Sequence, residues 1–83
     1  MSNSRINQTA VYPREVVNTA LKHHARSIIL VHNYPSGDVK PSRADIAVTR
    51  DIEKALTVMG MTLHDHLIIA DTICVSFTSL GHL

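Results

Sequence analysis

The stretch SIILVHNYPSGDVKPSRAD, residues 27–45, contains the pattern that decides the fold. Residues 27–31 form a compact β-branched and aliphatic run that ends at polar residues, which is typical of a strand buried on both faces. Residues 33–41 hold two of the three prolines and one of the three glycines, so they predict a loop. Ser42 suits the cap of a following helix, with Asp45 three residues further on. The stretch therefore predicts a central strand, a loop and the start of a helix.

Helical and β patterns flank this stretch on both sides. Pro13, an acid in the first turn and apolar residues at helical spacing predict a helix over about 13–25. The helix after Ser42 is expected to continue to Gly60. Two strands, 62–70 and 72–77, are expected next, with a tight turn at 70–72. This order predicts an α/β sandwich with a sheet of three or four strands.

The remaining segment, residues 1–11, is polar and has no strong period. We expect a loose lead-in there, with a short strand near Thr9 to Val11. The sheet then has few strands to flank the apolar one at 27–31. An uncovered edge or apolar face predicts a homo-oligomer, most simply a dimer.

Length and composition limit the class of protein. The chain has 83 residues, of which 45% are hydrophobic and 18% charged, so residues 1–83 predict one small globular domain. A net charge of +1 without a basic block argues against an extended phosphate-binding surface. Cys74 is the only cysteine and is expected to be a small core residue, which favours a reducing cytoplasm. No apolar run approaches the roughly 20 residues of a membrane span.

The polar residues of the same stretch resemble a known family signature. His32-Asn33-Tyr34-Pro35-Ser36-Gly37-Asp38 and Pro41-Ser42-Arg43-Ala44-Asp45 resemble the RadC-like branch of the JAB/MPN family, long attached to DNA repair. Metalloprotease members of that family carry the JAMM motif, which is His-x-His, seven residues, Ser, two residues and Asp. Tyr-Pro-Arg-Glu-Val at 12–16 and Asp65-His66 are also similar to that branch.

The resemblance covers roughly residues 8–83 and has consequences for the fold. It implies a three-layer-type sandwich of the JAB/MPN, cytidine-deaminase-like kind, here with an incomplete sheet and two main helices. It also implies a chain truncated at the N-terminus, in which the single domain 1–83 lacks the family's first strands.

The resemblance also implies roles for four positions. In the family, two histidines and an aspartate bind zinc, a serine helps hold the water or the oxyanion, and an earlier glutamate takes the water's proton. Transferred residue by residue, His32 and Asp45 are metal ligands and Ser42 is the catalytic helper. Tyr34 stands at the second histidine's position, and a neutral phenol is a poor zinc ligand at pH 7. Glu15, the only glutamate before His32, lies in a predicted helix start, so the catalytic glutamate has no counterpart. We therefore expect Zn2+ to bind weakly or not at all.

Three functions stay open on these grounds. The first is a metal-dependent hydrolase of peptide or isopeptide bonds, with a protein or peptide substrate and a degraded metal site. The second is a catalytically inactive binding or assembly module. The third is an accessory role in DNA repair, which the near-neutral charge supports little. Whether the chain is an enzyme is undecided at this point.

Each candidate residue also has a structural interpretation. The spacing of Ser42 and Asp45 is what helix capping alone requires, and His32 could simply close a buried strand. His64 and His66, two apart on a predicted strand, are expected to be exposed or core residues in preference to a second metal pair.

Overall fold

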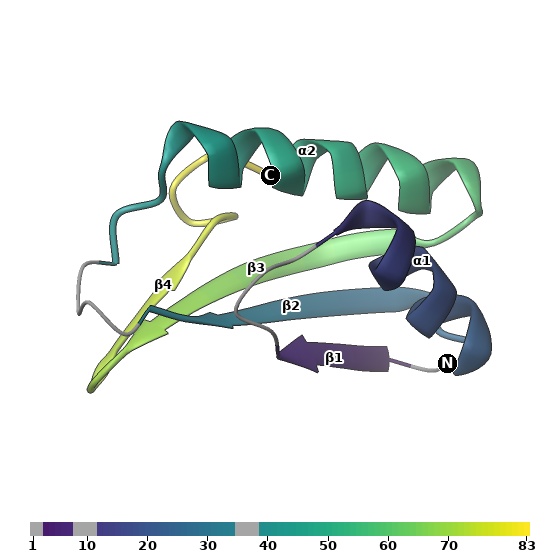
Figure 1. The fold of residues 1–83 in the computed structure, drawn as a ribbon, viewed down its shortest axis with the longest axis horizontal. Helices are drawn as coiled ribbons and strands as arrows, with labels where there is room; N and C mark the ends of the chain where they lie inside the picture. The colour runs from purple at the N-terminus through teal and green to yellow at the C-terminus, as the bar shows by residue number, and fades with distance from the viewer. Residues whose placement is uncertain (1–2, 8–11, 35–38) are drawn as a thin grey trace.

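The computed structural model describes residues 3–7, 12–34 and 39–83, with side chains from residue 12 onward. In these ranges, four strands form one mixed sheet in the order β1-β2-β3-β4, as Figure 1 shows. The central strand β2 (Ser27–Asn33) pairs in parallel with β1 (Asn3–Asn7) and with β3 (Thr62–Ala70). The last strand, β4 (Ile73–Ser76), runs antiparallel to β3. The predicted central position of the apolar run is confirmed.

β1 lies in the segment that the sequence predicted to be a loose lead-in, and that prediction is wrong for residues 3–7. Asn3 pairs with Ser27, and the register continues to Asn7, which pairs with Val31. A strand at a sheet edge is held largely by backbone hydrogen bonds to its neighbour, which need no apolar period in its own sequence. The strand predicted near Thr9 to Val11 lies outside the described residues.

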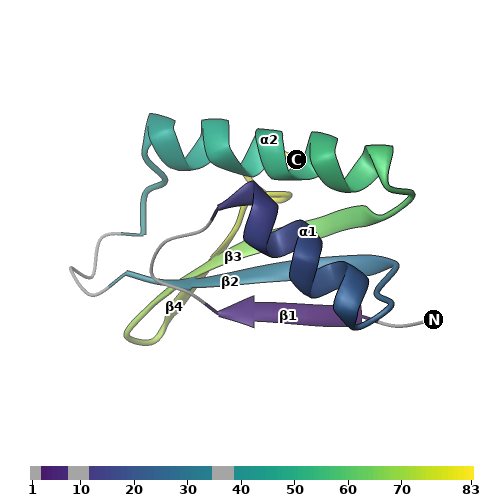
Figure 2. The same cartoon turned by 45° about the vertical axis from the view of Figure 1, so that its right-hand side comes forward.

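Two helices, α1 (Pro13–Lys22) and α2 (Arg43–Val58), lie on the same face of the sheet (Figures 1 and 2). They belong to two successive parallel crossovers, β1-α1-β2 and β2-α2-β3, which advance in the same direction along the sheet. Right-handed crossovers of this kind place both helices on one side. The predicted α/β class is confirmed, and the described residues form a helical layer over a sheet layer.

The core lies between these two layers. Its fully buried members come from both helices and from the central strands, and include Val16, Ala20, Ile28, Leu30, Ile52 and Leu56. Alternation along β2 sends Ile28 and Leu30 toward the helices and leaves Ile29 and Val31 on the opposite face.

None of the described helices has the length and apolar character that crossing a membrane requires.

The helix ends follow local backbone chemistry. α1 ends at Lys22, three residues earlier than predicted, because His24 adopts a left-handed conformation at φ 53°. The amide of Ala25 then donates to the carbonyl of Ala20 at 2.9 Å, which closes the helix end. α2 ends at Val58, and Gly60 at φ 78° turns the chain toward β3.

Candidate functional site

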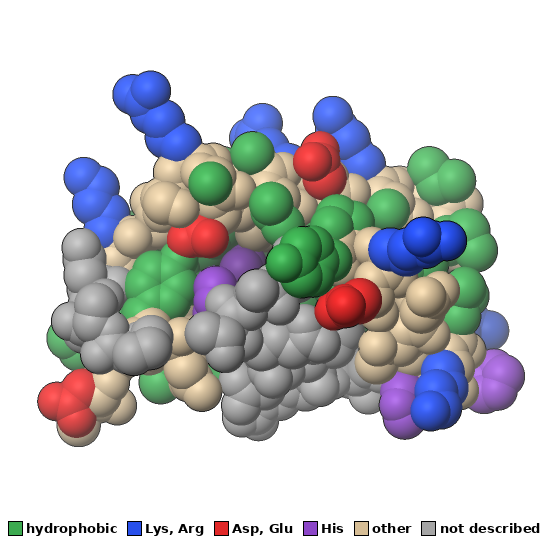
Figure 3. Space-filling view, in the orientation of Figure 1, with side chains coloured by type: hydrophobic (Ala, Val, Ile, Leu, Met, Phe, Trp, Pro, Cys, Tyr) green, Lys and Arg blue, Asp and Glu red, His purple; other side chains and the backbone are tan. Residues whose placement is uncertain are grey.

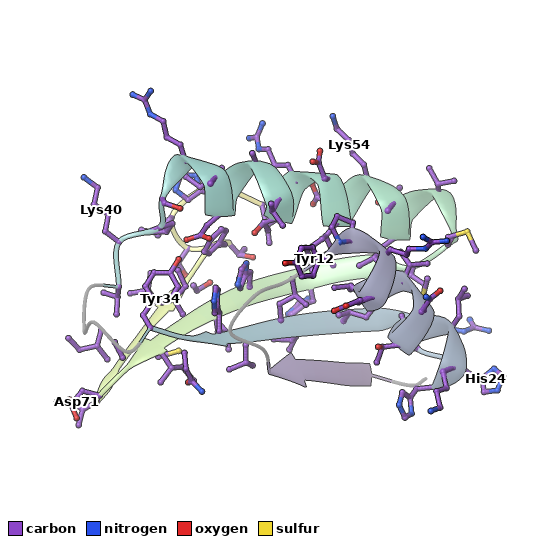
Figure 4. All side chains as sticks on the ribbon, in the orientation of Figure 1. Tyr12, His24, Tyr34, Lys40, Lys54 and Asp71 are labelled. Carbon is purple, nitrogen blue, oxygen red and sulfur yellow. The ribbon has the colours of Figure 1, made fainter. Side chains whose placement is uncertain are left out.

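The end of β2 and the first turn of α2 bring Tyr34 and Asp45 together. The amide of Tyr34 donates to the carbonyl of Ile69 at 2.9 Å, which extends the pairing of β2 with β3 by one residue. This places Tyr34 below the start of α2, where its hydroxyl donates to Oδ2 of Asp45 (Figure 4). The Tyr34 ring also meets the His32 ring edge to face, with centroids 4.9 Å apart. His32, Tyr34 and Asp45 thus form one cluster.

Ser42 lies at the N-terminal end of α2 and acts there as a helix cap. Its hydroxyl accepts a hydrogen bond from the amide of Asp45 at 3.1 Å, and its own amide donates to the Asp45 carboxylate at 3.4 Å. This reciprocal pair is a capping box, which satisfies donors that the first helical turn leaves open. The capping interpretation of the Ser-x-x-Asp spacing is therefore confirmed.

The Asp45 carboxylate is already engaged by two donors, the Tyr34 hydroxyl and the Ser42 amide. The Asp45 backbone carbonyl accepts a third hydrogen bond, from the hydroxyl of Thr49 at 2.7 Å. Thr49 lies one turn further along α2 and is 1% exposed. Asp45 therefore joins the cap of α2, the end of β2 and the buried side of the helix.

His66 on β3 extends the cluster into the interior. Its ring lies nearly parallel to the His32 ring, with centroids 5.8 Å apart and an interplanar angle of 13°. On the other side it stacks on Phe77 at 4.3 Å. Phe77 in turn contacts His82. Five rings, from Tyr34 through to His82, thus contact one another in series.

Burial keeps His66 neutral. Its side chain is 3% exposed, and Nδ1 lies 2.8 Å from the Thr49 hydroxyl, while no described residue hydrogen-bonds to Nε2. Desolvation, together with the nearby His32, lowers the pKa of His66 from 6.5 to about 4, although the carboxylates of Asp45 and Asp65 act in the opposite direction. His66 therefore accepts or donates hydrogen bonds at neutral pH without carrying a charge.

His64 and His66 take the exposed and the core position expected of them. His64 is exposed and falls where the β2–β3 register shifts, since Ile28 pairs with Leu63 and Ile29 pairs with Asp65. The bulge breaks the alternation that would place both histidines on one face.

Cys74, predicted as a core residue, is exposed on the edge strand β4, and that prediction is wrong.

Sequence reasoning missed Thr49 and Phe77 as members of this cluster. A threonine on the apolar face of α2, in line with the buried Ile52 and Leu56, was the available signal. Figure 3 shows the contrast between the two sides of that helix. Lys and Arg side chains extend from its outer side, whereas histidine side chains show below it.

The donor set does not fit a catalytic zinc, which needs three protein ligands and an open fourth position. His32 and Asp45 supply one nitrogen and one carboxylate, and the Tyr34 phenol already donates to that carboxylate. Over residues 3–7, 12–34 and 39–83, no three His, Cys, Asp or Glu side chains surround a common point.

Comparison with known proteins agrees with the signature in residues 32–45. The profile of the RadC-like JAB domain matches residues 1–82. A UPF0758 protein of Bordetella pertussis (strain Tohama I) is 45% identical over 83 residues, which is all of this chain and 37% of the relative. A UPF0758 protein of Ruegeria pomeroyi is 49% identical over 78 residues, covering 94% of this chain and 35% of the relative. The chain thus spans little more than a third of the length of these relatives, and it belongs to the RadC-like JAB domain family.

Proposed function

We propose that this chain is a binding or assembly module built on a RadC-like JAB scaffold, in which a hydrogen bond closes the position that holds zinc in metalloprotease relatives. The observation that carries the proposal is the bond from the Tyr34 hydroxyl to the Asp45 carboxylate. This residue pair occupies two of the three ligand positions of the family motif. At one position the phenol of Tyr34 replaces an imidazole, and at the other an oxygen of the Asp45 carboxylate already accepts a hydrogen bond.

The chemistry of Tyr34 and Asp45 supports the proposal that their hydrogen bond closes the metal position. A phenol with a pKa near 10 keeps its proton at pH 7, so it donates to a carboxylate instead of binding a cation. A metal ion at this point would have to displace that donor from Asp45 and would gain no third ligand in return. Two protein ligands do not make up the three that a catalytic zinc site uses.

His66 does not replace the missing imidazole. Histidine nitrogens bind metals along lone pairs that lie in the ring plane, and the rings of His32 and His66 stack at an interplanar angle of 13°. Lone pairs in two nearly parallel planes do not converge on one ion. One nitrogen of His66 is also in contact with Thr49 at 2.8 Å. The stacked arrangement therefore supports a structural role for His66.

The test is zinc titration by calorimetry on the unmodified chain, Tyr34→Phe and Tyr34→His. The unmodified chain should bind zinc with micromolar or poorer affinity. Tyr34→Phe releases Asp45 without adding a ligand, so it should stay weak. Tyr34→His should bind about 100-fold more tightly, since even outer-shell partners of zinc sites contribute 10–100-fold. Tyr12→His is the matched control because it adds an imidazole at an exposed position.

Two results would contradict the proposal. One is stoichiometric zinc retained by the unmodified chain during dialysis against a mild chelator. The other is zinc-dependent cleavage of a peptide or isopeptide substrate that is abolished by His32→Ala, which would restore the hydrolase function.

A further inference from the structure

The contacts around Asp45 form a closed ring of five residues, which we call the contact ring: Asp45, Thr49, His66, His32 and Tyr34. Its first half consists of hydrogen bonds, from the Thr49 hydroxyl to the Asp45 carbonyl at 2.7 Å and between Thr49 and His66 at 2.8 Å. Its second half consists of ring contacts, from His66 to His32 and from His32 to Tyr34. The Tyr34 hydroxyl then returns to the Asp45 carboxylate. The contact ring links β2, β3 and α2.

The hydrogen bonds have a defined direction. A hydroxyl has one proton, and Thr49 donates it to the carbonyl of Asp45. Thr49 can therefore only accept from His66, so Nδ1 of His66 must carry the proton. Nε2 then holds a lone pair, and burial at 3% exposure keeps that nitrogen away from solvent. Thr49 thus selects one tautomer of His66 and fixes the plane of its ring.

We propose that Thr49 and His66 are positioning residues, which hold the His32 ring and through it the hydrogen bond between Tyr34 and Asp45. The inference rests on the proposed function, because that hydrogen bond is what closes the metal position. Loss of the Thr49 hydroxyl would leave a buried Nδ1–H without an acceptor. An unsatisfied buried donor is costly, so the imidazole would change tautomer or rotate. The His32 ring, which stacks on that of His66, would then shift, and its edge-to-face contact with Tyr34 would weaken.

The experiment compares Thr49→Val with Thr49→Ser and uses Thr57→Val as the control. Valine keeps the shape of Thr49 and removes the hydroxyl, whereas serine keeps the hydroxyl. Thr57 makes the same kind of helix bond, to the carbonyl of Glu53 at 2.8 Å, but on the exposed side of α2. Nitrogen-15 NMR reports the His66 tautomer, and proton NMR reports exchange of the Tyr34 hydroxyl proton with water. The chain has two tyrosines, so Tyr12→Phe assigns the signal.

We expect the unmodified chain to show the Nδ1–H tautomer of His66 and a slowly exchanging Tyr34 hydroxyl. Thr49→Val should speed that exchange about tenfold, the factor of one lost hydrogen bond. Thr49→Ser should restore slow exchange, and Thr57→Val should leave it unchanged.

Several outcomes would overturn the inference: an Nε2–H tautomer in the unmodified chain, unchanged exchange in Thr49→Val, or equal effects of Thr49→Val and Thr57→Val. If Thr49→Val does not fold, the tautomer in the unmodified chain and the exchange rate in Thr49→Ser decide the question. No zinc enters these measurements. A failure here is therefore distinguishable from a failure of the proposed function, which the zinc titration judges.

Discussion

Replacing Asp65 by asparagine should destabilise the fold by removing the anchor of the segment after β4. The carboxylate accepts three hydrogen bonds: from the amide of His66 at 2.7 Å, from the amide of Thr78 at 3.0 Å and from the Ser76 hydroxyl at 2.5 Å. It thereby ties the end of β4 and the turn beyond it to β3. Asparagine keeps one carbonyl oxygen for the two amides, but it loses the charge and presents an NH2 group to Ser76.

The expected loss in the free energy of unfolding follows from the weaker hydrogen bonds that a neutral asparagine makes. A hydrogen bond to a charged acceptor contributes about 1.5–3 kcal/mol, against about 0.5–1.5 kcal/mol for a neutral one. Partial exposure of Asp65 lets water replace some of the loss. We therefore expect a decrease of about 1–2 kcal/mol in the free energy of unfolding at pH 7. For a domain of this size, that is a decrease in Tm of roughly 5–10 °C.

The effect should depend on pH in a defined direction. Burial alone would raise the pKa of Asp65, but the hydrogen bonds from Ser76, Thr78 and His66 outweigh it and hold the pKa below 3.8. A carboxyl group whose pKa is depressed in the folded state contributes stability above its unfolded pKa and loses it as pH falls through the folded value. The difference between the parent and Asp65→Asn should therefore be full at pH 7 and shrink below about pH 4.

Thermal unfolding followed by circular dichroism at pH 7 and pH 3 measures both quantities. Asp71→Asn is the matched control, since Asp71 is exposed in the β3–β4 turn and asparagine also tolerates its left-handed φ of 54°. Asp71→Asn also removes one negative charge, but it leaves the three hydrogen bonds of the Asp65 carboxylate intact. Equal stability of the two variants at pH 7, or an Asp65→Asn deficit of the same size at both pH values, would refute the reasoning.

Two further predictions concern the start of α2 and the face of the sheet opposite the two helices. Ser42→Ala removes the hydroxyl of the capping box and should lower the free energy of unfolding by about 1 kcal/mol in urea titration, and a change below about 0.3 kcal/mol would contradict the capping role. We also expect self-association, because the face opposite the helices carries the half-buried, apolar Ile29, Leu67 and Ile69. Sedimentation should show a dimer or larger species at tens of micromolar, whereas a monomer at all concentrations would exclude it.

Local patterns were sufficient to predict most of the fold. The apolar run at 27–31 identified the central strand, and the strands at 62–70 and 72–77 match β3 and β4 to within a residue or so. These elements depend on burial of their own side chains, which leaves a period in the sequence. β1 was missed because its pairing with β2 is a backbone interaction that leaves no such period.

For the candidate site too, the sequence was sufficient to predict one part, and the other part depended on the fold. The spacing of His32, Tyr34, Ser42 and Asp45 identified the family, and the spacing of Ser42 and Asp45 predicted the capping box. A capping box joins residues only three apart in the chain, so the local sequence is enough to predict it. That Tyr34 donates to Asp45 depends on how the end of β2 lies relative to the start of α2 in the folded protein.

The sequence by itself determined the family, the order of the main helices and strands and the missing imidazole at Tyr34. Only the tertiary structure decided that Thr49 and His66, 17 residues apart, meet beneath α2 and that His66 stacks on His32. The same holds for Asp65 and Thr78, which are 13 residues apart. Contacts of this kind depend on the packing of separate elements, and a β-bulge changes which side chains of β3 face the helices. The chain carries no local period from which such a geometry can be read.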